Sequence, residues 1–157
     1  MIHATVAELA AALGPRQRLM GLDVGQKTIG LAISDSDLKV AAALDTIRRT
    51  KFTKDAEALG RLIVERAVGG LVIGLPVSMD GSEGPAAQSV RQFAANLDAK
   101  LDIHIVFWDE RLSTSAVQRF LVDEADMSRR RRAEVVDKMA AAYILQGALD
   151  SLGAGRP

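Results

Sequence analysis

Residues 19–33 constrain the fold of this chain more than any other stretch. They form two short apolar runs, typical of buried β-strands, on either side of a turn that contains Gly25. A single carboxylate, Asp23, lies at the end of the first run. An ionised carboxylate inside a sheet costs free energy unless a cation or hydrogen bonds compensate for its lost hydration. Asp23 is therefore either a metal ligand or a well-compensated structural residue.

Three interpretations of this strand–turn–strand remain open from the stretch alone. It can hold divalent metal ions that cleave phosphodiesters, or it can wrap nucleotide phosphates as actin-like ATPases and sugar kinases do. In either case Gly25 and Gly30, which lack a Cβ, would let the backbone turn tightly and a ligand approach closely. In the third interpretation, Asp23 only caps the turn of a β-hairpin.

The hydrophobic pattern of the whole chain predicts an α/β fold. Three consecutive strands form an antiparallel meander, and helices then alternate with parallel strands, which gives a mixed sheet with helices on both faces. The expected strands are residues 19–24, 28–34, 40–47, 71–75 and 103–108. The expected helices are residues 5–13, 54–68, 86–100, a helix capped by Ser113 or Thr114, and 133–152. Gly69 and Gly70 are expected to end the second helix, and residues 126–132 to form a charged loop.

Size and composition favour a single domain over residues 1–157, with residues 1–15 as an N-terminal helical extension peripheral to the sheet. The 20 basic and 20 acidic residues balance, so any contact with nucleic acid must come from a local patch. The chain has no cysteine, which excludes disulfides and is compatible with the cytoplasm, where we expect the protein. The sequence pattern predicts neither a signal peptide nor a membrane span.

Three carboxylates that lie far apart in the sequence are predicted to meet at one edge of the sheet. Asp23 lies in the first strand, and Glu110 follows the last strand, at whose carboxyl end open α/β sheets tend to bind ligands. Asp137 shares a face of the final helix with Ala141 and Ile144, and this face is expected to pack on the sheet. Mg²⁺ and Mn²⁺ prefer oxygen ligands, and two such ions about 4 Å apart can cleave a phosphodiester. Each carboxylate alone has an ordinary structural explanation, but their joint occurrence favours a metal centre.

Four sequence blocks resemble the signature of the YqgF/RuvX family of RNase H-like, RuvC-like nucleases. They are residues 21–25 with 29–32, residues 72–76 with 79–83, residues 109–114, and Asp137 with Ala140, Ala141, Ile144 and Leu145. The resemblance covers nearly the whole chain after Arg16, in the same order. It implies an RNase H-like fold, a metal-dependent endonuclease that uses Mg²⁺ or Mn²⁺, and catalytic and metal-binding roles for Asp23, Glu110 and Asp137. Members of the family are described both as maturation nucleases for the 5′ end of pre-16S rRNA and as Holliday junction resolvases.

Several polar residues near the same edge are candidates for contacts with nucleic acid. They are Lys27 in the first turn, Ser78 and Ser82 in a Gly- and Ser-rich loop, Arg111 after the last strand, and the run Arg129, Arg130, Arg131 and Arg132 before the final helix. A solvated charged loop and a plain connector are the simpler explanations of the Arg run and the Ser-containing loop. Aromatic residues are few, so binding of single strands by base stacking is not favoured.

We therefore predict a metal-dependent nuclease whose partner is structured nucleic acid, most simply precursor rRNA in ribosome biogenesis, or branched DNA as the alternative. Ribosomal precursor particles are a further expected partner, and the protein is expected to be a monomer or a homodimer. Two other hypotheses stay open. One is an RNA-binding ribosome-assembly module with structural carboxylates. The other is an actin-like ATP-handling domain, which would need a second lobe. The role of Asp109 is also open, because neighbouring strand residues point to opposite faces.

Overall fold

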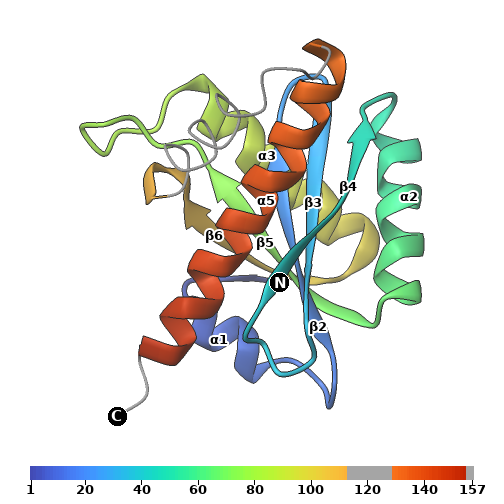
Figure 1. Ribbon diagram of the computed structural model, residues 1–157, viewed down its shortest axis with the longest axis vertical. Coiled ribbons are helices and arrows are strands. Elements are labelled where there is room, and N and C mark those ends of the chain that lie inside the picture. The colour runs from blue at the N-terminus through green and yellow to red at the C-terminus, as the bar shows by residue number, and fades with distance from the viewer. Residues whose placement is uncertain (113–128, 155–157) are drawn as a thin grey trace.

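The computed structural model describes residues 1–112 and 129–154, and the strands within these ranges form one sheet in the order β1-β6-β5-β2-β3-β4 (Figure 1). The strands are β1 (Ile2–His3), β2 (Arg18–Val24), β3 (Thr28–Ser34), β4 (Ala41–Arg48), β5 (Val68–Leu75) and β6 (His104–Asp109). The helices are α1 (Val6–Ala11), α2 (Phe52–Glu65), α3 (Pro85–Leu101) and α5 (Arg129–Ala154), with a 3₁₀ turn, η1 (Glu110–Leu112), after β6. The predicted α/β class with a mixed sheet is confirmed.

Strand direction brings four strand ends to one edge of the sheet. β2, β3 and β4 form the predicted antiparallel meander, whereas β2, β5, β6 and β1 run parallel. Since β4 is antiparallel to β3, which is itself antiparallel to β2, β4 points the same way as β2. The carboxyl ends of β2, β4, β5 and β6 therefore lie together, and we call this the carboxyl edge. Side chains there are neighbours in space although they are distant in sequence.

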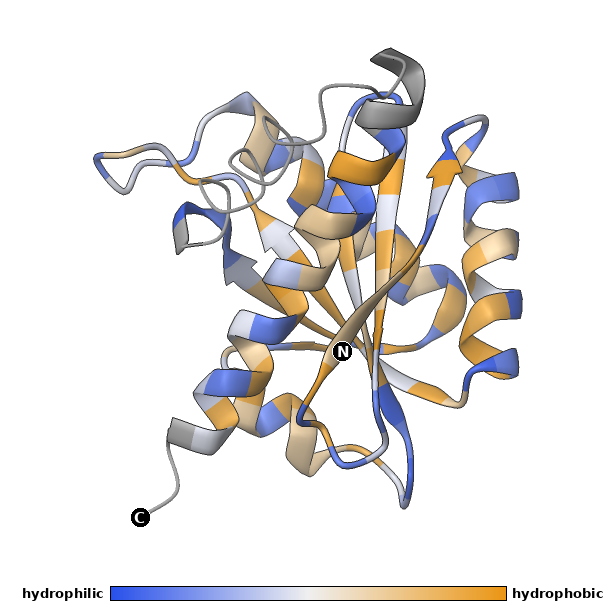
Figure 2. Ribbon diagram, in the orientation of Figure 1, coloured by the Kyte–Doolittle hydropathy of each residue, from blue (hydrophilic) through white to orange (hydrophobic). Residues whose placement is uncertain are grey.

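Different helices cover the two faces of the sheet, and each face contributes alternate residues of every strand. One face packs against α2 and α3 through strand residues that include Met20, Leu22, Leu31 and Ile73. The other face packs against α1 and α5 through Leu19, Ala32, Val72 and Val106. Figure 2 shows the apolar strands enclosed between helices that carry both apolar and hydrophilic residues.

Glycines on the α5 face let α5 cross the strands at very short range. A Cβ on Gly30 would lie 1.9 Å from the carbonyl oxygen of Asp137, and a Cβ on Gly21 would lie 2.8 Å from that of Ala141. Neither strand position accepts a side chain unless α5 moves, because both distances are well below van der Waals contact. The space above Gly30 is filled by the backbone of α5 and not by a ligand, which corrects the expectation from the sequence.

The N-terminal stretch contains the predicted helix, but it is not peripheral to the sheet. Val6 and Leu9 of α1 are buried against it, and an edge strand that was not predicted precedes the helix. The Thr5 hydroxyl accepts a hydrogen bond from the Glu8 N–H at 3.1 Å, which caps α1 as its sequence indicates. Before this cap, β1 pairs in parallel with β6, with Ile2 opposite Ile105. A strand of two residues carries no readable alternation, so the sequence pattern could not reveal it.

Two predicted boundaries were wrong. Gly69 and Gly70 do not end α2; they lie inside β5, where a Cβ would meet Gln17 Oε1 at 2.3 Å and Leu9 Cδ1 at 2.8 Å. They are small because α1 and the segment before β2 pack closely on them. The second error concerns residues 129–132, which begin α5 and do not belong to a loop. The predicted helix after Ser113 or Thr114 lies outside the described residues, as do residues 126–128 of the predicted charged loop.

Candidate active site

Asp23 and Glu110 lie together at the carboxyl edge. Asp23 is the second-last residue of β2, and Glu110 is the first residue of η1, directly after β6. Their carboxyl groups share a hydrogen bond. β5 separates β2 from β6, and its residue Gly74 leaves the room for this contact, because a Cβ there would lie 2.6 Å from Glu110 Oε1. The glycine thus lets a side chain from one strand end reach across a neighbouring strand.

Asp137 joins this pair from the helix above the sheet. Gly30 pairs with Asp23 across β2 and β3, so Thr28, two residues earlier in β3, points to the same α5 face. The Thr28 hydroxyl donates a hydrogen bond to Asp137 Oδ2. The negative charge of Asp137 also acts on Asp23. The structure therefore brings all three predicted carboxylates to the same side of the sheet and the same edge.

Burial raises the pKa of all three carboxyl groups. The pKa of Asp23 rises to about 8, first through lost hydration and then through the charge and hydrogen bond of Glu110 and the charge of Asp137. Burial also raises the pKa of Glu110, although the hydrogen bond with Asp23 acts in the opposite direction. The pKa of Asp137 is raised by burial and is partly lowered again by the hydrogen bond from Thr28. Such crowding of acids is costly unless protons or cations neutralise it.

The donor set fits a hard divalent cation. The three side chains offer only carboxylate oxygens, the ligands that Mg²⁺ and Mn²⁺ prefer. A cation there would offset both the lost hydration and the mutual repulsion that raise the pKa of Asp23. Within residues 1–112 and 129–154, however, no three acidic or histidine side chains are close enough to form a complete metal site. Asp137 is directed to Thr28 in this arrangement, so a shared cation requires its carboxylate to shift.

Asp109, whose role the sequence left open, does not join the three carboxylates. Its side chain accepts hydrogen bonds from Arg111 Nε at 2.9 Å and from Arg111 Nη2 at 2.6 Å. These bonds lower the pKa of Asp109, the opposite of the shift at Glu110. Asp109 therefore holds the guanidinium of Arg111, and it acts on Glu110 only through its charge.

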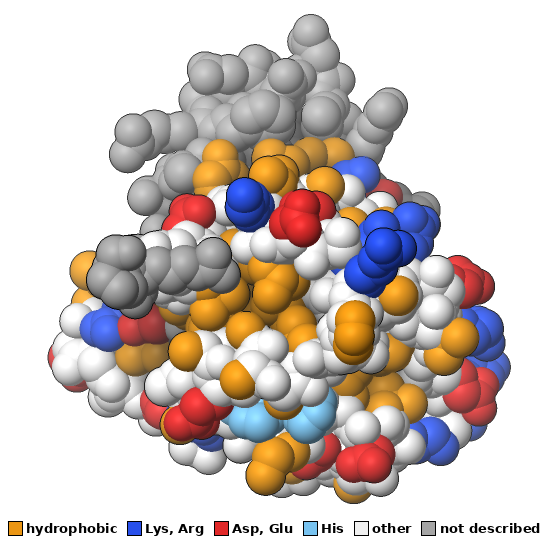
Figure 3. Space-filling model, turned by 90° about the horizontal axis from the view of Figure 1, so that it is seen from below, with side chains coloured by type: hydrophobic (Ala, Val, Ile, Leu, Met, Phe, Trp, Pro, Cys, Tyr) orange, Lys and Arg blue, Asp and Glu red, His pale blue; other side chains and the backbone are white. Residues whose placement is uncertain are grey.

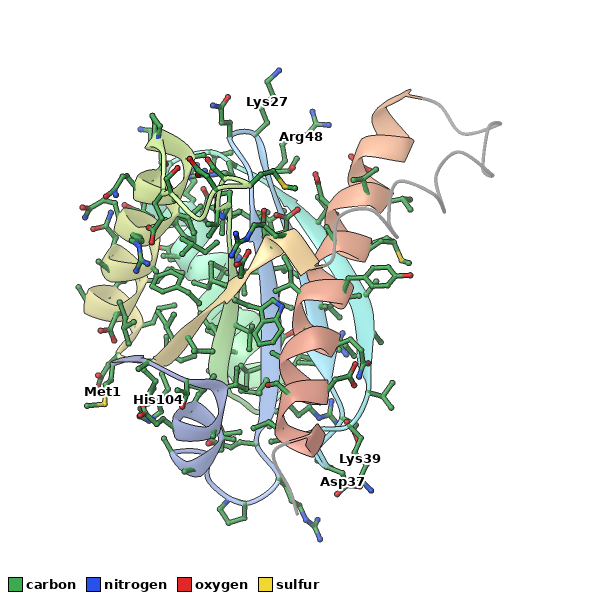
Figure 4. All side chains as sticks on the ribbon, turned by 90° about the vertical axis from the view of Figure 1, so that its left-hand side faces the viewer. Met1, Lys27, Asp37, Lys39, Arg48 and His104 are labelled. Carbon is green, nitrogen blue, oxygen red and sulfur yellow. The ribbon has the colours of Figure 1, made fainter. Side chains whose placement is uncertain are left out.

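The residues predicted to contact nucleic acid have different surroundings. Lys27 is exposed in the β2–β3 turn, at the end of the molecule where Arg48 also lies (Figure 4). Ser78 and Ser82 belong to the loop between β5 and α3, where the Ser78 N–H donates to the Ser82 carbonyl at 2.9 Å. The Ser82 hydroxyl donates to Asp80 Oδ1 at 2.6 Å, so this loop binds its own polar groups.

The Arg run begins α5, and two residues that were not predicted lie beside the carboxylates. Arg129, Arg130, Arg131 and Arg132 form the first turn of α5, and their side chains lie outside the described part of the structure. Thr28 and Gly74 were not predicted as site residues. An isolated glycine in a strand indicates close approach of another group, so the sequence could have indicated that a side chain approaches Gly74. Thr28 gave no such signal, because its role depends on how α5 crosses β3.

A groove among the described residues lies away from the carboxylates. It has a volume of about 570 Å³, runs between α1 and the end of α5, and is lined mainly by apolar residues such as Val6, Ala10, Val106 and Leu152. Figure 3 views this end of the molecule and shows apolar side chains gathered beside the two histidines. No helix among the described residues is long and apolar enough to cross a bilayer.

Comparison with known proteins identifies the family. The profile described as "RuvX: Holliday junction resolvase" matches residues 17–151. The chain belongs to the RuvX family. A protein of Paramagnetospirillum magneticum is 66% identical over 92% of this chain and 93% of its own length, and one of Rhodospirillum rubrum is 60% identical over 94% and 92%. Both carry the name "Putative pre-16S rRNA nuclease". The predicted family and the predicted nuclease class of this RuvX chain are confirmed.

Solved structures confirm the fold of the RuvX chain. The structure of Thermus thermophilus RuvC in complex with a Holliday junction substrate has a TM-score of 0.55 and 10% identity, and the match covers 88% of this chain and 97% of that chain. The fowlpox virus resolvase in complex with Holliday junction DNA has a TM-score of 0.52, also with 10% identity, over 87% and 99%. The shared architecture is the RNase H-like mixed sheet predicted from the sequence.

Proposed function

We propose that this RuvX protein is a divalent-metal-dependent endonuclease that processes the 5′ end of pre-16S rRNA, with Asp23, Glu110 and Asp137 as the catalytic, metal-binding residues. The observation that carries the proposal is the gathering of three carboxyl groups with raised pKa at the carboxyl edge. The substrate is proposed from relatives that are 57–66% identical and carry that name. The second candidate, cleavage of Holliday junctions, rests on the description of the family.

Three features of the chain prepare these carboxylates for Mg²⁺ or Mn²⁺. Asp23 and Glu110 share a hydrogen bond, so a proton held by this pair must leave before both can bind a cation. Thr28 orients Asp137 and favours its ionised form. Gly74 leaves space for the Glu110 side chain. When bound, the metal supplies Lewis-acid polarisation of a phosphate and activation of water.

Residues around the carboxylates would position the substrate. Lys27 and Arg111 lie on opposite sides of Asp23 along the sheet, and Arg129, Arg130, Arg131 and Arg132 lie at the same end of α5 as Asp137. We propose that these cations, with Ser78 and Ser82, contact the sugar–phosphate backbone. Such contacts fix the register of a strand but do not read its bases. A substrate of precursor rRNA would also place the protein in the cytoplasm with ribosomal precursor particles.

The test is a cleavage assay with two substrates in parallel. Wild type and Asp23→Asn are incubated with an RNA that spans the 5′ boundary of 16S rRNA and with a four-way DNA junction, in Mg²⁺, Mn²⁺ or EDTA. We expect wild type to cut the RNA only with metal and Asp23→Asn not to cut. Asp37 is an exposed carboxylate at the opposite end of the molecule (Figure 4), so Asp37→Asn is the matched control and should cut normally. Cleavage by Asp23→Asn at the wild-type rate would overturn the site, and preferential cleavage of the junction would overturn the substrate.

A further inference from the structure

Arg48 ends β4 at the carboxyl edge and lies on the same face as the carboxylates. It pairs with Thr28 across β3 and β4, and paired residues of neighbouring strands point to the same face. Thr28 is the residue whose hydroxyl binds Asp137. In Figure 4, Arg48 and Lys27 extend outward at the same end of the molecule. A cationic side chain thus stands directly beside the acidic site, on its β4 side.

The guanidinium of Arg48 is only loosely held. Its Nη2 lies 3.6 Å from Glu134 Oε1, beyond ordinary hydrogen-bond distance, and its side chain is 60% exposed. Exposed ion pairs of this kind contribute little stability. Glu134 itself is fixed to β4, because the Thr46 hydroxyl donates to its carbonyl oxygen at 2.8 Å. A guanidinium has five N–H donors in a planar fork, so, as far as contacts with residues 1–112 and 134–154 are concerned, most of the donor capacity of Arg48 is available to a phosphate.

Two other arginines of the carboxyl edge, Arg49 and Arg111, are bound much more firmly. Arg49 Nη1 donates to the carbonyl oxygen of Gly25 at 2.6 Å, and its guanidinium lies 5.1 Å from the centre of the Phe93 ring. This arrangement fastens the β2–β3 turn. Arg111 makes short hydrogen bonds to Asp109 through both Nε and Nη2. Of these three arginines, Arg48 therefore has the weakest internal contact and the largest capacity to bind a ligand.

The position of Arg48 also fits the path of a polynucleotide across the site. β6, which is followed by η1 with Arg111, is separated from β4 by β5, β2 and β3. Strands are about 4.8 Å apart, so the two ends of this path are roughly 19 Å apart. Along the axis of a B-form DNA duplex that distance corresponds to roughly five or six base pairs. The carboxylates lie between these ends, where the bond to be cut would lie.

We propose that Arg48 is a phosphate-binding residue that anchors the nucleic-acid strand on the β4 side of the carboxylates, and that Glu134 holds its guanidinium in place until a phosphate displaces it. This inference rests on the proposed nuclease function and adds the side from which the substrate strand is held. The ligand is the phosphodiester backbone, so the contact is independent of base sequence.

The experiment measures binding without cleavage. A fluorescent RNA spanning the 5′ boundary of 16S rRNA is titrated in EDTA at several Na⁺ concentrations with wild type, Arg48→Gln and Lys39→Gln. Lys39 is the charge-matched control, because it is exposed at the opposite end of the molecule (Figure 4). Losing one phosphate contact should weaken binding several-fold at low salt and reduce the salt slope by about 0.7–0.9. We expect this change for Arg48→Gln and none for Lys39→Gln. Equal slopes in the two variants would overturn the proposal.

Glu134→Gln tests the second half of the proposal. Releasing Arg48 from Glu134 should tighten binding a few-fold, and the gain should disappear in the Arg48→Gln/Glu134→Gln double variant. An equal gain in both backgrounds would show that Glu134 acts only through its charge. A metal-dependent cleavage assay of wild type tests the proposed nuclease function separately from the role of Arg48. If wild type cleaves but Arg48→Gln binds RNA with the wild-type salt dependence, the role of Arg48 is rejected and the nuclease function stands. If Arg48→Gln has a reduced salt dependence but wild type does not cleave, the nuclease function is rejected and the role of Arg48 stands.

Discussion

Gly74 of β5 lies directly beneath the Glu110 side chain, so that a Cβ on this glycine would approach Glu110 Oε1 to 2.6 Å and Glu110 Cγ to 2.9 Å. The same Cβ would meet Ile144 Cδ1 of α5 at 2.5 Å. One missing methyl group therefore serves two purposes: it lets α5 pack on the sheet and lets Glu110 reach Asp23. This relationship makes Gly74 a sensitive position although it carries no chemical group.

Gly74→Ala should impair cleavage more than it impairs folding. The added methyl displaces Glu110 and the flexible end of Ile144, with a cost in the free energy of unfolding of about 1–3 kcal/mol. The displaced Glu110 should weaken Mn²⁺ binding and slow cleavage by at least tenfold. Calorimetric Mn²⁺ titration and the cleavage rate measure both effects. Gly84→Ala, where a Cβ meets nothing within 4 Å, is the matched control. Unchanged Mn²⁺ affinity in Gly74→Ala would contradict the role given to Glu110.

Thr28→Val should shift the pH profile of cleavage. The hydroxyl donates to Asp137 and lowers its pKa against the raising effect of burial, so its removal lets the pKa rise further. The acidic limb of the rate profile should therefore move to higher pH, by roughly half to one pH unit for a hydrogen bond of ordinary strength. Thr28→Ser keeps the hydroxyl and should restore the profile. A rate that falls equally at every pH would indicate that Thr28 acts only on packing.

The carboxylate cluster was predictable because it depends on features that the sequence expresses locally. Asp23 interrupts an apolar strand, and Glu110 follows one directly, so the rule that parallel strands end at one edge brings them together. The helical period placed Asp137 on the face of α5 that packs on the sheet. Strand β3 was predicted with its observed bounds, because its apolar run ends in a polar turn at both sides.

The features that were missed depend on contacts between distant segments. The Thr28–Asp137 hydrogen bond and the Arg48–Glu134 ion pair require the crossing point of α5 over β3 and β4, which no local pattern encodes. Gly69 and Gly70 read as a helix end, yet their small size serves the packing of Leu9 and Gln17 on β5. The Arg run read as a loop because of its charge, although arginine is a good helix former.

Gly30→Ala should be among the most destabilising single substitutions in this protein. The new methyl would lie 1.9 Å from the Asp137 carbonyl oxygen and 2.9 Å from the Lys138 nitrogen, and both are backbone atoms that cannot rotate away. We expect a loss in the free energy of unfolding of about 3 kcal/mol or more, since α5 must lift from the sheet. Urea unfolding measures this loss. Gly153→Ala, with nothing within 4 Å, should be nearly neutral. A wild-type midpoint for Gly30→Ala would show that α5 does not rest on β3 at this point.

The stability of the metal-free protein should fall as pH rises through neutrality. Asp23 has a pKa of about 8 in the folded chain and an ordinary value of 3.8 when unfolded, so between these values the folded state binds the extra proton. The stabilisation is fully present below about pH 4 and is lost by about pH 8, at no more than about 1.4 kcal/mol per pH unit. Urea unfolding in EDTA between pH 5 and pH 9 measures this slope.

Two variants and one cation assign that slope to Asp23. Asp23→Asn cannot ionise, so its stability should vary less with pH and should exceed that of wild type at pH 9. Asp37→Asn should keep the wild-type slope, because its carboxyl group is exposed. Mg²⁺ binds the ionised form, so it should stabilise wild type more at pH 8 than at pH 6 and should stabilise Asp23→Asn little at either pH. If Mg²⁺ stabilised Asp23→Asn as much as wild type, the cation would be bound elsewhere, and the proposal that the three carboxylates bind the metal would be wrong.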